Sequence, residues 1–250
     1  MATSFQRARS PEHKQQRREA ILEAATKLAA RDGVRAVTLT DIAAEVGVHK
    51  SAILRYFETR EAVFLLLTAD GWQDWATAVE QALPGPTDPQ DVAALLAGTL
   101  ADRTLFCDLL SHAPLHLERG VSEQEVRSFK LTTLDAVDRV IRALTRAMPW
   151  IDKNQGVDLV AGMTAMAASL WQTSNPPDTL ARLYVSDPRL AHAIVEFTPR
   201  LERLAGLLLA GVSQHADQPA DWRSRTGRGP SLDRAAAVTG TVGATPGGSG

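Results

Sequence analysis

The segment DIAAEVGVHKSAILRYF (residues 41–57) constrains the fold of this chain more than any other. It contains two short apolar patterns at helical spacing, and Gly47 separates them. A glycine at such a junction allows the positive φ that a tight turn between two helices requires. The pattern predicts a helix-turn-helix whose inward side chains pack on the preceding helix. These inward side chains are Ile42, Ala43, Val46, Val48, Ile53 and Phe57.

The side chains expected on the outer face are mostly polar or charged: His49, Lys50, Ser51, Arg55 and Tyr56. A helix that presents such a set can enter the major groove of DNA, where Lys and Ser meet base edges and phosphates. We therefore interpret this face as a surface that reads double-stranded DNA. The alternative is that these residues only cap and solvate two surface helices.

Residues 17–64 resemble the amino-terminal domain of the tetracycline-repressor (TetR) family of bacterial transcriptional regulators. The resemblance lies in GVRAVTLTDIAAEVGVHKSAILRYFETREAVF, which matches the family pattern in spacing and in residue type. It implies phosphate contacts for Thr40, Tyr56 and Arg60, and base-edge contacts for Lys50, Ser51 and Arg55. Thr40 and Arg60 are also each expected at the start of a helix, where free N–H groups attract a phosphate.

The segment departs from the family pattern at several positions. His49 stands where the family usually has a capping Ser, so we expect the reading helix to start less firmly. Leu54 replaces a Tyr whose hydroxyl commonly reaches a phosphate, and we assign it no such contact. Ala52 replaces a frequent Thr, and Arg60 replaces a Lys and keeps its charge.

Ala and Leu dominate the rest of the chain, and no segment reads as a strand, so the sequence predicts an all-α fold. Helix start and stop signals predict helices over about 10–33, 40–46, 50–57, 59–83, 88–114, 122–148, 153–173 and 187–212. Pro199 is expected to kink the last helix. The expected domains are 1–16 (a basic arm and the start of the first helix), 17–62 (a three-helix helix-turn-helix domain), 63–212 (a larger helical ligand-binding and dimerisation domain) and 213–250 (a disordered tail).

Charge is distributed unevenly along the chain. Residues 1–60 contain 11 Lys and Arg against 7 Asp and Glu, whereas the remainder contains 16 against 22. A basic end on an acidic body favours contact with a polyanion at that end alone. The early cations are candidates for tracking phosphates or entering the minor groove, unless they form only a solvated face. They are Arg7, Arg9, Lys14, Arg17 and Arg18.

An apolar stripe in the last expected helix suggests a dimer. Its members lie at spacings of 4, 3, 4, 3 and 4, as in a seam between packed helices: Leu190, Ile194, Phe197, Leu201, Leu204 and Leu208. The stripe alone would fit the core of one chain better, but the family resemblance implies dimerisation through the last two long helices. Two copies on a twofold axis would read half-sites about 34–36 Å apart, or a multiple of that distance.

The family resemblance also implies a small-molecule pocket between residues 60 and 173. It implies that a ligand bound in this pocket tilts the fourth helix and so separates the reading domains. Large apolar and Met side chains line adaptable pockets. The candidates are Trp75, Phe106, Leu110, Phe129, Met163, Met166 and Trp171. Packing in the core is the alternative interpretation for each of them.

Other classes of protein are disfavoured. Cys107 is the only cysteine, which excludes an intrachain disulfide and a cysteine-rich metal site. His112 and His116 have the spacing of two zinc ligands on one helix, but Pro114 interrupts that helix, so we expect no metal and no cofactor. The chain lacks a membrane-length apolar run and a secretory signal, which predicts a cytoplasmic protein.

Enzyme motifs, such as a Gly-rich phosphate loop, a nucleophile elbow or HExxH, are also missing from the sequence. The sequence thus predicts a homodimeric transcriptional regulator, most simply a repressor that an unidentified small molecule releases from its operator. An activator, a ligand-independent regulator and an architectural DNA-binding protein are the alternatives.

Overall fold

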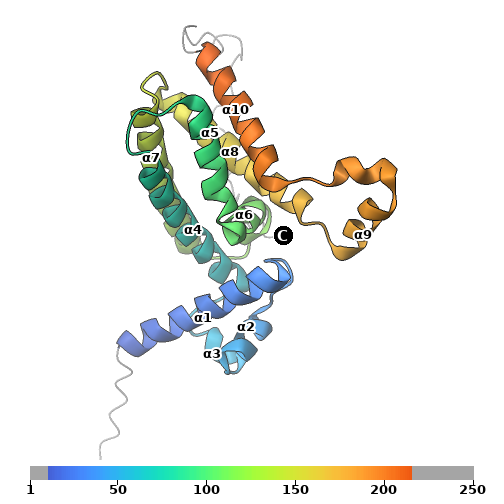
Figure 1. The fold of residues 1–250 in the computed structure, drawn as a ribbon. Coiled ribbons are helices and arrows are strands. Elements are labelled where there is room, and N and C mark those ends of the chain that lie inside the picture. Colours follow the sequence, from blue (N-terminus) through green and yellow to red (C-terminus); the bar gives the residue numbers. More distant parts are fainter. Residues whose placement is uncertain (1–10, 216–250) are drawn as a thin grey trace, which may run out of the picture.

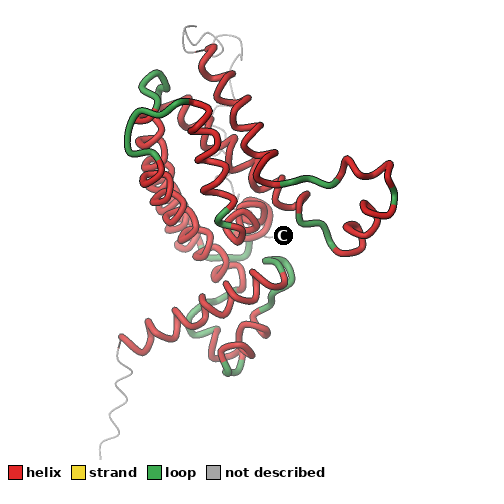
Figure 2. Tube along the Cα trace, in the orientation of Figure 1, coloured by secondary structure: helices red, strands yellow, loops and turns green. Residues whose placement is uncertain are grey.

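The computed structural model describes residues 11–215, and this range is helical with no strand (Figure 1, Figure 2). The all-α prediction is confirmed. The elements are α1 (Pro11–Asp32), α2 (Leu39–Val46), α3 (Lys50–Ile53), α4 (Arg60–Ala82), α5 (Pro89–Ala101), α6 (Thr104–His112), the π-helix η1 (Ala113–Leu117), α7 (Glu123–Ala147), α8 (Lys153–Ser174), α9 (Asp178–Ser186), the 3₁₀ helix η2 (Pro188–Ala193) and α10 (Phe197–His215).

The helices form two parts, which α4 connects (Figure 1). The reading domain, α1 to α3, lies at one end of the molecule. In the body, α4 pairs with α7, and α10 packs on α5 and α8. Because α1 contacts α4 and α6, these two helices position the reading domain relative to the body.

Local sequence signals account for most helix starts. Ser122 and Glu125 form the capping box that the sequence predicts at the start of α7. Thr59 and Asp88 cap α4 and α5, where each side chain accepts a hydrogen bond from a backbone N–H in the first turn. These N–H groups have no partner within the helix, so the caps stabilise the predicted starts.

An aromatic cluster joins α4 to α6 in the core. The ring centroids of Trp72 and Trp75 lie 5.5 and 6.2 Å from that of Phe106. Trp75 is fully buried, and its indole N–H donates to Thr99 Oγ1 over 3.1 Å. Gly71 lets the Phe106 ring approach α4, because a Cβ at this position would lie 2.5 Å from the ring. The cluster fixes α6 against α4.

Three predicted boundaries are wrong. The second helix starts after Thr38, not at Thr40, because Thr38 forms a capping box with Asp41. The third helix ends at Ile53, where the N–H groups of the next turn donate to the Ile53 carbonyl. The helix predicted over 88–114 divides into α5 and α6, since Arg103 has a non-helical backbone with φ −120° and ψ 58°.

The largest correction concerns the arm, residues 175–196, which contains α9 and η2 (Figure 1). The single helix predicted over 187–212 is replaced by η2, an extended segment and α10. Pro199 lies in the first turn of α10 and does not interrupt the helix, because a residue there needs no intrahelical N–H partner. The expected tail falls largely outside the described residues, although α10 continues three residues beyond Val212, to His215.

Candidate nucleic-acid interface

The turn between α2 and α3 depends on Gly47, which has a φ of 72°. The Gly47 N–H donates to the Ala44 carbonyl over 3.0 Å, and the Val48 N–H donates to the Ala43 carbonyl over 2.9 Å. This pair of bonds is the Schellman arrangement, which requires a left-handed residue at the helix end. The positive φ predicted for Gly47 is confirmed, and the turn directs the chain into α3.

The starts of α2 and α3 are both capped by side chains. Hydrogen bonds from the side chain and the backbone N–H of Thr38 lower the pKa of Asp41, so this carboxylate stays charged in the capping box. At α3 the cap is His49, whose Nδ1 accepts a hydrogen bond from the Ser51 N–H over 3.3 Å. His49 therefore caps α3, the helix for which the sequence pattern predicted a less firm start.

The reading surface consists of Lys50 and Ser51 at the start of α3 and Arg55 in the turn that follows it. All three residues are exposed, and the side chains of Lys50 and Arg55 make no hydrogen bond or ion pair within residues 11–215. Thr40 is exposed in the first turn of α2, and Leu54 is exposed beside Arg55. The reading surface thus presents unneutralised cations to solvent.

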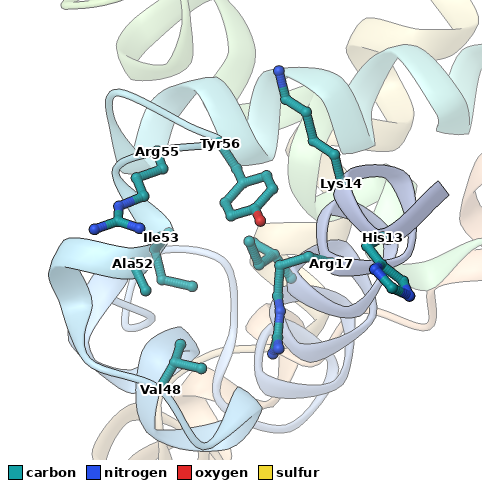
Figure 3. A pocket seen from close by; sticks show the side chains of 9 residues that line it. His13, Lys14, Arg17, Val48, Ala52, Ile53, Arg55 and Tyr56 are labelled. Atoms are coloured by element: carbon teal, nitrogen blue, oxygen red, sulfur yellow. The ribbon is translucent and has the colours of Figure 1, made fainter. Parts of the chain in front are cut away.

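A groove of about 580 Å³ separates α3 and its following turn from the amino-terminal half of α1 (Figure 3). Its apolar part includes Val48 and Ile53, whereas Lys14, Arg17 and Arg55 supply cations from both sides. Tyr56, expected on the outer face, is half-buried, and its ring points into this groove (Figure 3). The cations extend the positive surface from α3 onto α1.

Arg60 and Arg18 are held by the protein itself. The Arg60 guanidinium donates to the carbonyls of Val34 and Val37 and lies 4.6 Å from the centre of the Phe64 ring. Its side chain is 20% exposed, so the geometry favours a structural role over the expected phosphate contact. Arg18 lies 4.4 Å above the Phe57 ring. Arg7 and Arg9 fall outside the described residues.

The candidate ligand-binding residues divide by burial. Trp75, Phe106, Phe129 and Met163 are buried in the core, whereas Leu110, Met166 and Trp171 are half-buried. Trp171 packs edge-on against Phe197, with 5.6 Å between ring centroids. Phe106 also lines a cleft of about 330 Å³ between α4 and α6, whose rim carries Asp70 and Asp74. Of these candidates, Phe106 lines the cleft, and none lines the groove beside α3.

The predicted dimer stripe is not one surface. Leu201 is fully buried in the core of the chain, as are Ala205 and Leu209 on the same side of α10. Leu204 and Leu208 are half-buried. Leu190 lies in η2 and Ile194 in the extended segment, so both precede α10. Phe197 is the first residue of α10. The helix predicted from 187 begins only at Phe197, so the residues of the stripe do not all lie on one helix.

His112 and His116 lie at the junction of α6 and η1, with 6.1 Å between ring centroids. His112 Nε2 is 3.4 Å from Asp108 Oδ1. Within residues 11–215, no three His, Cys, Asp or Glu side chains are placed to hold a metal ion. Burial raises the pKa of the Cys107 thiol to about 12, so the thiol is protonated and a poor metal ligand. None of the helices in this range is long and apolar enough to cross a membrane.

Comparisons with known proteins agree with this architecture. The family model described as "Bacterial regulatory proteins, tetR family" matches residues 21–67, and the model "Tetracyclin repressor-like, C-terminal domain" matches residues 69–216. No curated protein sequence matches the chain.

Several solved structures share the fold, among them a TetR family transcriptional regulator. PfmR from Thermus thermophilus is 16% identical, with a TM-score of 0.50 over 76% of this chain and 97% of that one. The fatty acid degradation regulator FadR from Bacillus halodurans is 15% identical, with a TM-score of 0.51 over 78% and 95%. The multidrug binding protein EbrR, complexed with imidazole, is 19% identical, with a TM-score of 0.50 over 78% and 94%.

The two family models together span the helix-turn-helix and the helical body, and the second alone covers more than half of the chain. The family consists of regulators and not of enzymes. This chain therefore belongs to the TetR family of DNA-binding transcriptional regulators.

Proposed function

We propose that this protein represses transcription by binding its operator as a homodimer, and that it leaves the operator when a small molecule occupies its body. The observation that carries the proposal is the reading surface. Lys50 and Arg55 are exposed cations on a helix-turn-helix and have no anionic partner within the described residues. A cationic helix face of this kind suits the major groove.

The exposed residues divide by the part of DNA they reach. With α3 in the major groove, Lys50 and Ser51 meet base edges, and Arg55 meets a base or the adjacent phosphate. Lys14 and Arg17 contact the phosphate backbone from α1, and Thr40 contacts it from α2. We propose no DNA contact for Arg60, because its guanidinium already donates to backbone carbonyls of the protein.

Exposed apolar side chains of α8, the arm and α10 support the homodimer. Leu207 of α10 is 63% exposed and Val157 of α8 is 42% exposed, and the arm exposes Leu183 and Val185. Apolar groups on adjoining elements favour burial against a second copy of the same surface. A dimer also places two short reading helices on two half-sites, which gives the sequence specificity that a single α3 lacks.

A lipophilic or amphipathic effector fits the half-buried candidates Leu110, Met166 and Trp171. FadR is named a fatty acid degradation regulator and EbrR a multidrug binding protein, and the names of these two proteins of similar fold agree with such an effector. Release of DNA needs a coupling of only about 1–3 kcal/mol between the two sites. An activator or a ligand-independent regulator would use the same reading surface.

Selection of genomic fragments by the full-length protein would give the operator, and anisotropy titrations would then give its affinity. We expect Lys50→Ala combined with Arg55→Ala to weaken operator binding at least about 30-fold, because each base contact contributes roughly 1–3 kcal/mol. Thermal unfolding should not change, since both side chains are exposed. Transcription from a promoter containing the operator distinguishes a repressor from an activator.

The matched control is Arg142→Ala combined with Arg146→Ala, which removes the same charge from exposed positions on α7 in the body. This control should bind the operator like the wild type. Unchanged affinity and salt dependence in the Lys50/Arg55 variant would refute the proposed reading surface.

A further inference from the structure

Charged side chains of two body helices hold the loop between α1 and α2, residues 33–38. From α6, Asp108 Oδ2 accepts a hydrogen bond from the Val34 N–H over 2.8 Å. From α4, the Arg60 guanidinium donates to the carbonyls of Val34 and Val37. Both backbone polar groups of Val34 are therefore occupied by side chains of the body, one from α4 and one from α6.

The carboxylate of Asp108 has partners on both of its oxygens. While Oδ2 accepts from the loop, Oδ1 accepts from Gln172 Nε2 of α8 over 2.7 Å. Asp108 is only 8% exposed, although it lies among the apolar residues of α6. A buried carboxylate is retained where such bonds compensate for its lost hydration.

The bonds to Asp108 favour its charged form. Burial by itself raises the pKa of this carboxyl group, but the hydrogen bonds from His112, Val34 and Gln172 together outweigh burial, and the pKa is lowered. The ionised carboxylate thus serves as an acceptor for both the loop and α8.

The position of the loop determines where the reading helices lie. The loop leads directly into Thr38, which caps α2, and α2 packs against α3. A shift of Val34 relative to α6 would therefore move the start of α2 and, with it, the reading surface.

We propose that Asp108 is a positioning residue that joins α8 to the α1–α2 loop through its two carboxylate oxygens and so fixes the reading helices relative to the body. The effect on DNA binding rests on the proposed function, whereas the effect on the loop does not. Gln172 donates to the carboxylate from the α8 side, and the Val34 N–H donates to it from the loop side.

The test compares Asp108→Ala, Asp108→Asn and Gln172→Ala in the full-length protein by amide hydrogen exchange and operator titration. Asp108→Ala should accelerate exchange in residues 33–38 by about ten- to hundredfold, as expected when a hydrogen bond to a charged group is lost. Exchange in residues 136–147 of α7 should stay unchanged, and operator affinity should fall about tenfold. Asp102→Ala, which removes an exposed carboxylate without a contact to the loop, is the matched control.

Asp108→Asn should stay within about threefold of the wild type in both measurements, because its oxygen still accepts from Val34 and its NH₂ can donate to a rotated Gln172 amide. Gln172→Ala should accelerate exchange in the same loop, but less than Asp108→Ala. Since Gln172 is exposed, this variant will fold even if Asp108→Ala does not, and it then carries the test.

Three results would overturn the inference: unchanged exchange at 33–38 in both alanine variants, equal acceleration along the whole chain, or an Asn variant as impaired as the Ala variant. If exchange changes as expected while the wild type selects no DNA sequence, the positioning role stands and the proposed function fails.

Discussion

The reading surface and the arm are both exposed, but their chemistry is opposite. Lys50, Ser51 and Arg55 are hydrophilic side chains that water solvates well. The arm instead exposes Leu183 and Val185, the latter at 78%, and none of the residues in its helices is buried. The reading surface is well hydrated until a polyanion displaces the water. The apolar side chains of the arm remain unfavourably hydrated until another apolar surface covers them.

Because of this difference, the two surfaces of one chain favour two different kinds of partner. An exposed cationic face favours association with DNA through counterion release, which salt weakens. An exposed apolar segment favours association with protein through the burial of apolar area, which salt does not weaken. A variant of one surface should therefore change one kind of association and leave the other unchanged.

The largest effect is expected from charge placed on the arm. Leu183→Asp combined with Val185→Asp should weaken the dimer more than about 100-fold, since each apolar side chain buried in an interface contributes roughly 1.5–3 kcal/mol. Sedimentation equilibrium of the full-length protein measures the change. Leu131→Asp combined with Leu134→Asp, at exposed positions of α7, is the control and should remain dimeric. A dimer that survives in the arm variant would remove the arm from the interface.

A smaller effect should distinguish two arginines that lie five residues apart. Arg60→Ala should lower the free energy of unfolding by about 1–3 kcal/mol, because two carbonyls in the loop lose their donor. Arg55→Ala should leave unfolding unchanged and weaken operator binding about tenfold. Chemical denaturation and anisotropy measure the two quantities. If both variants lose stability equally, Arg55 is not a free cation of the reading surface.

The smallest effect concerns glycines in opposite backbone conformations. Gly47→Ala should destabilise the protein by about 1–2 kcal/mol, because a residue with a Cβ is strained at the positive φ of this turn. Gly98→Ala in α5 should stabilise it by about 0.5–1 kcal/mol, since no atom outside the helix lies within 4 Å of the added Cβ. Denaturant titrations would show changes of opposite sign in the free energy of unfolding, provided that both variants keep the m-value of the wild type. A stabilised Gly47→Ala would mean that the turn tolerates another conformation.

The sequence indicates the fold of the reading domain well because its signals are local. Gly47, Ile42 and Ile53 determine the turn and the inward face within a few residues of each other, and the structure confirms the positive φ and the burial of both isoleucines. The capping box at Ser122 and the cap at Thr59 are confirmed for the same reason. The arm lacks comparable signals, and α9 was not predicted.

The site residues are less predictable because their roles depend on distant groups. Arg55 and Arg60 look equivalent in the sequence, yet only Arg60 lies near the carbonyls of Val34 and Val37. Asp108 gives one signal, an acid within the apolar stretch of α6, but its partner Val34 is 74 positions away. No spacing rule connects residues so far apart.

The sequence by itself determined the helical class, the helix-turn-helix and the family, since caps, glycines and apolar spacing act over a few residues along the chain. The tertiary structure alone decided which cations stay free, that Leu201 belongs to the core, and that a buried carboxylate joins α6 to the reading domain. These outcomes depend on contacts between helices, where packing and hydrogen bonding join residues that the chain keeps far apart.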